Sequence, residues 1–366
     1  MRILFSGYPS PFLGGGAISA LTLLKKLARK HKVIAFGVTV QPSRKEELSC
    51  GIKLYEKRLP YLLRRRFLPH HLRILLIESV AGSMAGRLIE EIQPDLIIMQ
   101  EPAIRILRRR KAKILVFVRY YDYWLGDFYS SWWRRIYNEP FSRIRSRRNL
   151  RILQKADLVL ANSKFTAKAL NQVGIEAEVV YPFVDLSSYK VPEVNREFIL
   201  FVHPTYLKGT DIVFQIAKRL PDQKFLIVGS TSQGLKRRFE GYKNVKLVGW
   251  CNDMRRAYEK AKVVLVPSVW QEPFGRVPIE AGISGIPAIA SNRGGLPESV
   301  GEGGILIKDI WNVEEWIRAI ERLDDPELYK ELSQKAIENA EKFDFKKTFQ
   351  EFKELVNVSL GLPEPL

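Results

Sequence analysis

Cysteine, acid-rich metal patterns and long apolar runs are all scarce in this sequence of 366 residues. Its two cysteines, Cys50 and Cys251, stand about two hundred positions apart, which excludes a disulfide framework or a cysteine zinc site and fits a reducing compartment. No apolar run approaches the roughly 18 residues of a membrane-spanning helix. Residues 1–16 are also too poor in apolar residues for a signal peptide. These absences predict a cytoplasmic protein.

Positive charge is abundant and unevenly distributed. The formal net charge is +19, and residues 1–185 hold 33 Lys and Arg against 15 Asp and Glu, whereas residues 186–366 hold 26 against 25. This asymmetry favours an anionic partner for the first half of the chain. The alternative is a generally solvated surface rich in lysine and arginine.

Apolar strands alternate with helical patterns throughout the chain. Residues 16–31, for example, repeat apolar side chains at helical spacing between two apolar segments, 1–9 and 32–40. In the first half we expect further strands at 94–100 and 112–120, a helix at 79–93, and a helix, strand, turn and helix within 149–174. In the second half we expect strands at 197–204, 224–230, 244–250, 262–268 and 286–292, with helices at 210–221, 252–261, 278–285, 313–323 and 326–343. Continuously apolar strands joined by helices are typical of parallel sheets covered on both faces.

The alternation of strands and helices is interrupted once. Residues 186–196 carry Pro, Ser and charges without periodicity, as a domain linker does. We therefore predict a Rossmann-like domain at 1–185, a second at 197–345, and a C-terminal helix within 346–366. In open α/β sheets ligands bind at the carboxyl ends of the strands, so the expected site lies there, between the domains.

Two glutamates, Glu272 and Glu280, stand in the stretch WQEPFGRVPIEAG at residues 270–282. Glu272 follows the strand expected at 262–268, and Pro278 suits the first turn of a helix, which puts Glu280 in that turn. Helix N-termini attract phosphate, and Arg276 would add charge there. The alternatives are a favourable interaction of Glu280 with the helix dipole and an ordinary solvated position for Glu272.

The motif continues through two further turns. Residues 272–280 read E-P-F-G-x-x-x-x-E, residues 281–287 A-x-x-x-G-x-P, and residues 294–298 G-G-x-P-E. Together they resemble the nucleotide-sugar site of retaining glycosyltransferases of family 4. The similarity extends to Lys208-Gly209 and to the Val-Gly-Trp turn at 248–250. It implies the GT-B fold, in which two doubly wound Rossmann-like α/β domains face each other across a cleft and the last helix packs back on the first domain.

The resemblance also implies roles for individual residues. Glu280 would accept hydrogen bonds from the donor ribose, Lys208 would neutralise the diphosphate, and Glu272 would contact the transferred sugar. Glu272, Lys208 and Asp122 are the expected catalytic residues. The residues expected to bind the donor are Gly15, Gly16, His203, Lys208, Gly229, Val248, Trp250, Glu272, Pro273, Phe274, Gly275, Arg276, Val277 and Glu280.

The expected reaction moves a sugar from a UDP- or GDP-sugar to a glycan or lipid-linked acceptor. Negative charge builds on the leaving diphosphate, and a cation with helix N–H groups supplies what a metal would supply elsewhere. No Asp-x-Asp pair occurs in the chain, so we expect no metal and no cofactor. Retention of configuration follows from the resemblance alone.

Three positions depart from the family pattern. The arginine usual before the phosphate lysine is absent, so either His203 or Arg276 compensates or stabilisation of the leaving group is weaker. The alternative for His203 is an ordinary strand-end position. Asp122 matches an acid near the donor sugar, but the histidine beside it is replaced by Tyr121, or by Arg119 in a shifted register. The glycines at 14–16 lack the lysine of glucan synthases, which argues against a polymerase.

The basic first half is expected to face the acceptor. Basic clusters at 64–66, 108–111 and 143–151 accompany an aromatic run that includes Trp124, Trp132 and Trp133. Aromatic rings suit stacking on sugars and a membrane interface, and arginine suits an anionic leaflet. This composition predicts peripheral attachment to the inner face of the cell membrane. The alternative is that Trp132 and Trp133 belong partly to the core and the arginines to a solvated face.

Two other functions are compatible with parts of the sequence. A nucleotide-sugar epimerase of the same fold would share the donor pocket but need other acids around the sugar. A nucleic-acid-binding protein would use the basic half, but no such motif is legible and the donor motif would have no purpose. We therefore expect no nucleic-acid partner.

Overall fold

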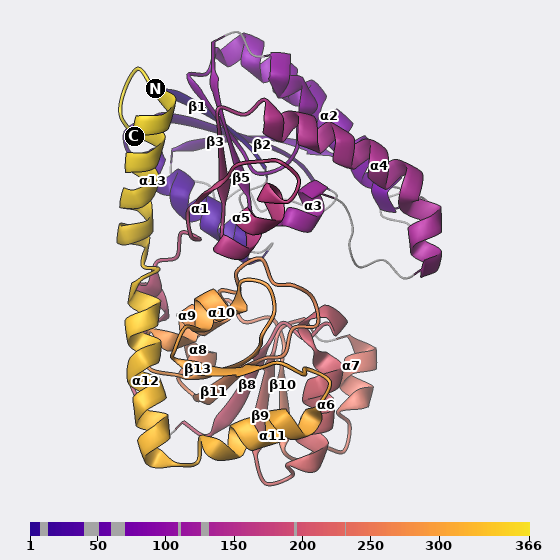
Figure 1. Cartoon of the computed structure of the whole chain (residues 1–366), viewed down its shortest axis with the longest axis vertical. Helices are drawn as coiled ribbons and strands as arrows, with labels where there is room; N and C mark the ends of the chain where they lie inside the picture. The colour runs from indigo at the N-terminus through magenta and orange to yellow at the C-terminus, as the bar shows by residue number, and fades with distance from the viewer. Residues whose placement is uncertain are drawn as a thin grey trace. The chain divides into compact units, whose positions relative to one another are not determined.

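The computed structural model describes residues 1–7, 14–39, 51–59, 70–108, 111–125, 132–193, 196–230 and 232–366. The chain divides into two compact units. One unit comprises Met1–Phe183 with Thr348–Leu366, and the other comprises Val184–Lys347. Each contains a parallel sheet with helices packed around it (Figure 1).

The first unit is built on a seven-stranded parallel sheet in the order β3-β2-β1-β4-β5-β6-β7. Its strands are β1 (Arg2–Ser6), β2 (Lys32–Thr39), β3 (Ile52–Arg58), β4 (Leu96–Met99), β5 (Lys113–Val118), β6 (Leu158–Ala161) and β7 (Glu178–Val179). Its helices are α1 (Gly15–Leu27), α2 (His70–Ile92), η3 (Ile104–Arg108), α3 (Tyr121–Leu125), α4 (Trp132–Gln154), α5 (Lys164–Asn171) and most of α13 (Phe345–Leu360).

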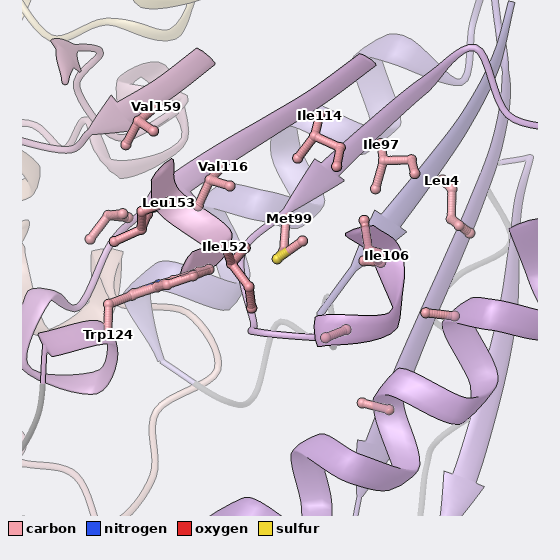
Figure 2. Packing of buried hydrophobic residues seen from close by; sticks show 14 of the residues in the cluster. Leu4, Ile97, Met99, Ile106, Ile114, Val116, Trp124, Ile152, Leu153 and Val159 are labelled. Carbon is pink, nitrogen blue, oxygen red and sulfur yellow. The ribbon is translucent and has the colours of Figure 1, made fainter. Parts of the chain in front are cut away.

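Alternating strand residues form the core of the first unit. Leu4, Ile97 and Val116 project from three neighbouring strands onto one face, where Trp124 and Ile152 cover them (Figure 2). The opposite side chains of the same strands are buried as well. Burial on both faces explains why these strands have continuously apolar sequences.

The second unit contains a six-stranded parallel sheet in the order β10-β9-β8-β11-β12-β13. Its strands are β8 (Phe198–Val202), β9 (Lys224–Val228), β10 (Val245–Val248), β11 (Ala261–Val266), β12 (Ala288–Ser291) and β13 (Gly304–Ile307). Its helices are η4 (Leu186–Tyr189), η5 (Tyr206–Lys208), α6 (Thr210–Arg219), α7 (Gln233–Arg238), α8 (Arg255–Tyr258), α9 (Val277–Gly282), α10 (Leu296–Val300), α11 (Val313–Arg322) and α12 (Pro326–Glu341).

The two faces of the second sheet have separate cores. Ile199 and Phe201 of β8 pack with α6 and α11, whereas Leu200 packs on the other face with α8, α9 and α10. The central strands β8 and β11 are neighbours although β9 and β10 intervene in the chain. The strand order therefore reverses between them, and in open α/β sheets this reversal is where ligands bind.

Several elements differ from the sequence-based prediction. The helix expected at 252–261 is only the four residues of α8, because β11 already begins at Ala261. The strands β3 and β13 and the helices α7 and α10 were not predicted. β13 is a four-residue edge strand whose first three residues are only partly buried, and β3 is rich in charge. Short edge strands lack the long apolar run that marks central ones.

Within the described residues, no helix combines the length and the apolar character needed to cross a bilayer.

Candidate donor-binding site

The loops after β8 and β11 pack closely together. Gly209 follows η5 with φ 85°, and a Cβ atom there would lie 1.9 Å from the backbone oxygen of Pro267. The N–H of Val269 donates to the carbonyl of Leu207 at 2.9 Å. Only glycine permits this approach, which fixes the preceding Lys208 against the loop after β11.

Lys208 and Glu272 form an ion pair at this point. Glu272 is 3% exposed, and its Oε1 atom accepts a hydrogen bond from the Ser268 hydroxyl at 2.6 Å as well as from the Lys208 ammonium. The same ammonium lies 5.6 Å from the centre of the Trp270 ring. Two of the three expected catalytic residues, separated by 64 positions in the sequence, are thus in contact.

Burial and neighbouring charge set the pKa values of Glu272 and of its neighbour His203. Burial alone would raise the pKa of Glu272, but the Lys208 charge and the hydrogen bonds from Lys208 and Ser268 together hold that pKa below its ordinary value. Burial and the Lys208 charge lower the pKa of His203. At neutral pH the site therefore contains a carboxylate, an ammonium and an uncharged imidazole.

The glycine pair at 294–295 packs against the backbone of the loop that carries Glu272. The N–H of Gly295 donates to the carbonyl of Glu272 at 2.7 Å, and that of Gly294 donates to the Gln271 side chain at 2.6 Å. A Cβ atom on Gly294 would lie 2.1 Å from the Glu272 carbonyl oxygen. The G-G-x-P-E turn thus positions the acid through backbone packing.

The middle of the motif turns into α9. Phe274 is buried with its ring edge-on to Phe343 at 5.2 Å. Gly275 has φ 86°, and a Cβ atom there would lie 2.5 Å from the Leu296 side chain. Val277 begins α9 directly after this turn, so the buried Phe274 ring anchors the loop that leads into the helix.

Glu280 lies in the first turn of α9 and is 8% exposed. Its Oε1 atom is 2.8 Å from the Arg276 Nη2 atom, and its Oε2 atom accepts a hydrogen bond from the Tyr258 hydroxyl at 2.8 Å. Arg276 also donates to the hydroxyl of Tyr189 at 3.0 Å. In this structure the Arg276 guanidinium is therefore paired with Glu280, and its expected role beside a phosphate stays a prediction.

The ends of β9 and β10 meet the loop after β8. The N–H of Gly229 is within hydrogen-bonding distance of the carbonyls of Val248 and Gly249, at 3.2 and 3.3 Å. A Cβ atom on Gly229 would lie 2.8 Å from the Pro204 ring. Trp250 is 48% exposed just beyond β10. The expected donor-binding residues Gly229, Val248 and Trp250 thus lie together near the carboxyl ends of neighbouring strands.

Three of the expected site residues, Gly15, Gly16 and Asp122, belong to the first unit. Gly15 and Gly16 begin α1, and a Cβ atom on Gly16 would lie 2.9 Å from the Tyr120 ring. Asp122 lies in α3, but its side chain is outside what the structure describes. Trp124 is 1% exposed and belongs to the core, so the prediction that it faces a sugar or a membrane is wrong.

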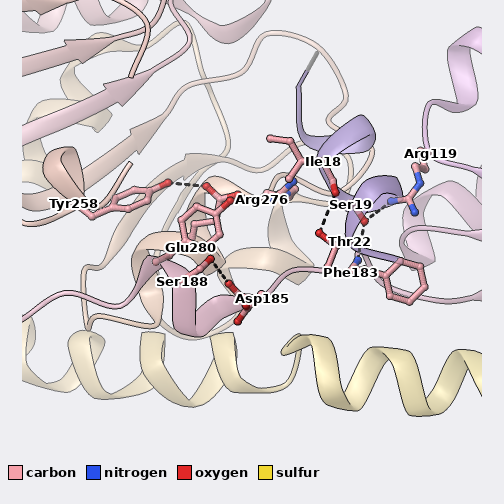
Figure 3. A network of polar contacts seen from close by, with 11 residues as sticks. Ile18, Ser19, Thr22, Arg119, Phe183, Asp185, Ser188, Tyr258, Arg276 and Glu280 are labelled. Carbon is pink, nitrogen blue, oxygen red and sulfur yellow. Dashed lines mark hydrogen bonds and ion pairs between the residues drawn. The ribbon is translucent and has the colours of Figure 1, made fainter. Parts of the chain in front are cut away.

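Neither residue considered as a substitute for the family's histidine is exposed. Arg119 donates to the Ser19 hydroxyl at 2.6 Å, and its guanidinium lies 4.1 Å from the centre of the Phe117 ring (Figure 3). Tyr121 packs edge-on against Phe165. Both side chains are parts of the interior of the first unit.

Sequence reasoning missed Ser268 and Tyr258, which bind the two site acids directly, and Tyr189, which binds Arg276. Each binds its partner from a different element, and no local pattern marks it. Only the Ser268 position, four residues before Glu272 at a strand end, offered a signal. Among the described residues, no three His, Cys, Asp or Glu side chains are grouped so that they could hold a metal ion.

Solved structures identify the class of fold. The chain matches sucrose-phosphate synthase from Thermosynechococcus elongatus with a TM-score of 0.80 at 19% identity, covering 98% of this chain and 99% of that one. It matches HepE of Anabaena in complex with UDP-glucose with a TM-score of 0.74 at 19% identity, covering 98% and 100%. The fold is GT-B, as the motif predicted.

Two family models together account for most of the chain. Residues 13–188 match "Glycosyltransferase Family 4", and residues 188–343 match "Glycosyl transferases group 1". The chain belongs to glycosyltransferase family 4, which confirms the resemblance drawn from the motifs. A D-inositol 3-phosphate glycosyltransferase of Mycobacterium sp. (strain KMS) is 28% identical over 218 residues, covering 51% of this chain. The match covers 49% of that protein, so the chain spans about half the length of the curated relatives it matches.

Proposed function

We propose that the chain is a retaining glycosyltransferase that moves a sugar from a UDP- or GDP-sugar to a glycan or lipid-linked acceptor. The observation that carries this proposal is the ion pair between Lys208 and the buried Glu272 at the point where the strand order reverses. HepE, a solved protein of the same fold, holds UDP-glucose. We place the donor on the second unit and the acceptor on the first.

The geometry suits the charge changes of glycosyl transfer. As the bond between sugar and diphosphate breaks, positive charge develops on the sugar and negative charge on the leaving group. Lys208 would leave Glu272 to bind the diphosphate, and its ammonium supplies the stabilising cation without a metal. The carboxylate of Glu272, fixed by Ser268, would then face the sugar. An uncharged His203 can donate one hydrogen bond beside them.

A panel of nucleotides and nucleotide sugars tests the donor assignment by thermal shift. One base should raise the melting temperature selectively, because a ligand at about 100 times its Kd stabilises the folded state by about 2.7 kcal/mol. Glu280→Ala should weaken binding of the same ligand by roughly 10- to 100-fold, since it removes charge-assisted hydrogen bonds. No shift with any UDP or GDP compound would reject the proposal. Conversion of the donor sugar without an acceptor would instead indicate an epimerase.

The second part of the proposal concerns an anionic membrane surface. The basic cluster at 143–151 divides in the structure. Arg145 and Arg148 are engaged with the buried Glu78, whereas Arg147 and Arg151 are exposed one helical turn apart on α4. Like charges at this spacing destabilise an isolated helix, and an anionic surface would relieve that repulsion. Ile144, 57% exposed on the same helix, would enter the interface.

Co-sedimentation with vesicles containing anionic lipid should show binding by the native protein that falls as salt is raised. Arg147→Glu with Arg151→Glu should weaken that binding by roughly tenfold or more, since each basic residue contributes about 1 kcal/mol near such a surface. Lys243→Glu with Lys246→Glu, an equal charge change on exposed residues of the second unit, is the matched control. Equal loss in both double variants would show a nonspecific charge effect and reject the α4 surface.

The remaining clusters do not bear on this proposal. Residues 64–66, 109 and 110 lie outside the described residues, as do the side chains of Arg108, Trp132 and Trp133.

A further inference from the structure

Both carboxylate oxygens of Glu280 are held by protein donors. Tyr258 of α8 binds Oε2, and Arg276 binds Oε1 while also donating to Tyr189 of η4. Figure 3 shows the Tyr258 hydroxyl directed at the Glu280 carboxylate. The rings of Tyr189 and Tyr258 pack against each other at 6.3 Å, which orients both hydroxyls.

The protonation of these groups keeps the arrangement intact across the physiological pH range. Burial, reinforced by the Glu280 charge, raises the pKa of Tyr258 well above its ordinary value, so its hydroxyl remains a donor. The same two causes raise the pKa of Tyr189 to about 12. Burial would lower the pKa of Arg276, but Glu280, Tyr189 and Tyr258 together outweigh burial and raise that pKa, so the guanidinium stays charged.

We infer that Tyr258 is a positioning residue that orients Glu280 for the two vicinal hydroxyls of the donor ribose, with Arg276 and Tyr189 fixing the other carboxylate oxygen. A carboxylate has about four lone-pair positions. One protein donor on each oxygen leaves one position on each for a ligand hydroxyl. This inference rests on the proposed function, because it takes Glu280 as the ribose-binding acid.

The test compares ribose with deoxyribose ligands. The affinities of UDP and GDP, and of their 2′-deoxy and 3′-deoxy counterparts, are measured by calorimetry for the native protein and for Tyr258→Phe. The variant should lose roughly tenfold in affinity for the ribonucleotide that the native protein prefers. It should lose less than about twofold for the deoxy counterparts, which offer Glu280 only one hydroxyl. The ratio of the affinity for the ribonucleotide to the affinity for its deoxy counterparts should therefore fall in the variant.

Tyr329→Phe is the matched control, because it also removes one tyrosine hydrogen bond in the second unit, from the Tyr329 hydroxyl to the Lys262 carbonyl at 2.9 Å. It should leave the ratio of ribose to deoxyribose affinity unchanged. Tyr189→Phe, at a less buried position, should also reduce the ratio of ribose to deoxyribose affinity. This variant replaces Tyr258→Phe in the test if Tyr258→Phe does not fold.

The outcomes separate this inference from the proposed function. Equal weakening of ribose and deoxyribose ligands in Tyr258→Phe, or an unchanged ratio, overturns the positioning role. A native protein that binds UDP or GDP without distinguishing ribose from deoxyribose overturns it as well. A native protein that binds neither nucleotide overturns the proposed function itself.

Discussion

Glu272→Gln should lower kcat/KM for sugar transfer by roughly 100- to 1,000-fold, while the affinity for the nucleotide alone changes little. The substitution keeps the size of a buried side chain and removes the negative charge that the structure places beside Lys208. Charge developing on the sugar in the transition state would lose its carboxylate partner. Initial rates with the donor identified by thermal shift, and calorimetry with the free nucleotide, measure the two effects.

Glu302→Gln provides the control for this variant. Glu302 is a well-exposed acid of the same unit, and its neutralisation should leave the rate within about twofold. Melting temperatures of both variants establish that loss of activity is not loss of fold. Retention of most of the transferase activity by Glu272→Gln would remove this residue from the catalytic site.

Lys208→Ala should reduce kcat by roughly 100- to 1,000-fold, because the leaving diphosphate loses its cation. The variant should also change the pH profile. Burial would raise the pKa of Glu272, and the charge and hydrogen bond of Lys208 are the largest of the interactions that together hold it below its ordinary value. Without Lys208 that pKa rises, so the residual activity should begin to fall at a higher pH as the solution is acidified.

Lys208→Arg and Lys218→Ala are the informative comparisons. Arginine keeps the positive charge, so Lys208→Arg should keep Glu272 ionised. The acid limb of its pH–activity profile should therefore stay close to that of the native protein. Lys218 is an exposed lysine on the following helix α6, and its removal should change neither rate nor pH profile. A Lys208→Ala variant with native kcat would show that the leaving group is stabilised elsewhere.

The two site variants should not act independently. Their side chains share one ion pair, so Lys208→Ala combined with Glu272→Gln should cost less than the product of the single effects. Independent, multiplicative losses would indicate that the contact has no role in the reaction.

Much of the architecture was predictable because central parallel strands are buried on both faces. The strands β8 and β11 are recognisable in the sequence as apolar runs. Two adjacent residues of β8, Ile199 and Leu200, face opposite cores. β13 was missed because an edge strand of four residues needs no such run. The short α8 was overestimated because helical spacing continues into Ala261, where pairing with β8 takes over.

The sequence by itself determined the family, the position of Glu272 at a strand end and of Glu280 in a first helical turn, and the imbalance of charge between the two halves. These features depend on residues close together in the chain, whose spacing and turn preferences are local. Only the tertiary structure decided that Lys208 meets Glu272, that Arg276 contacts Glu280 and Tyr189, and that Trp124 is core. Such contacts depend on which strands are neighbours and on which loops then meet. The local spacing of residues in the sequence does not predict either.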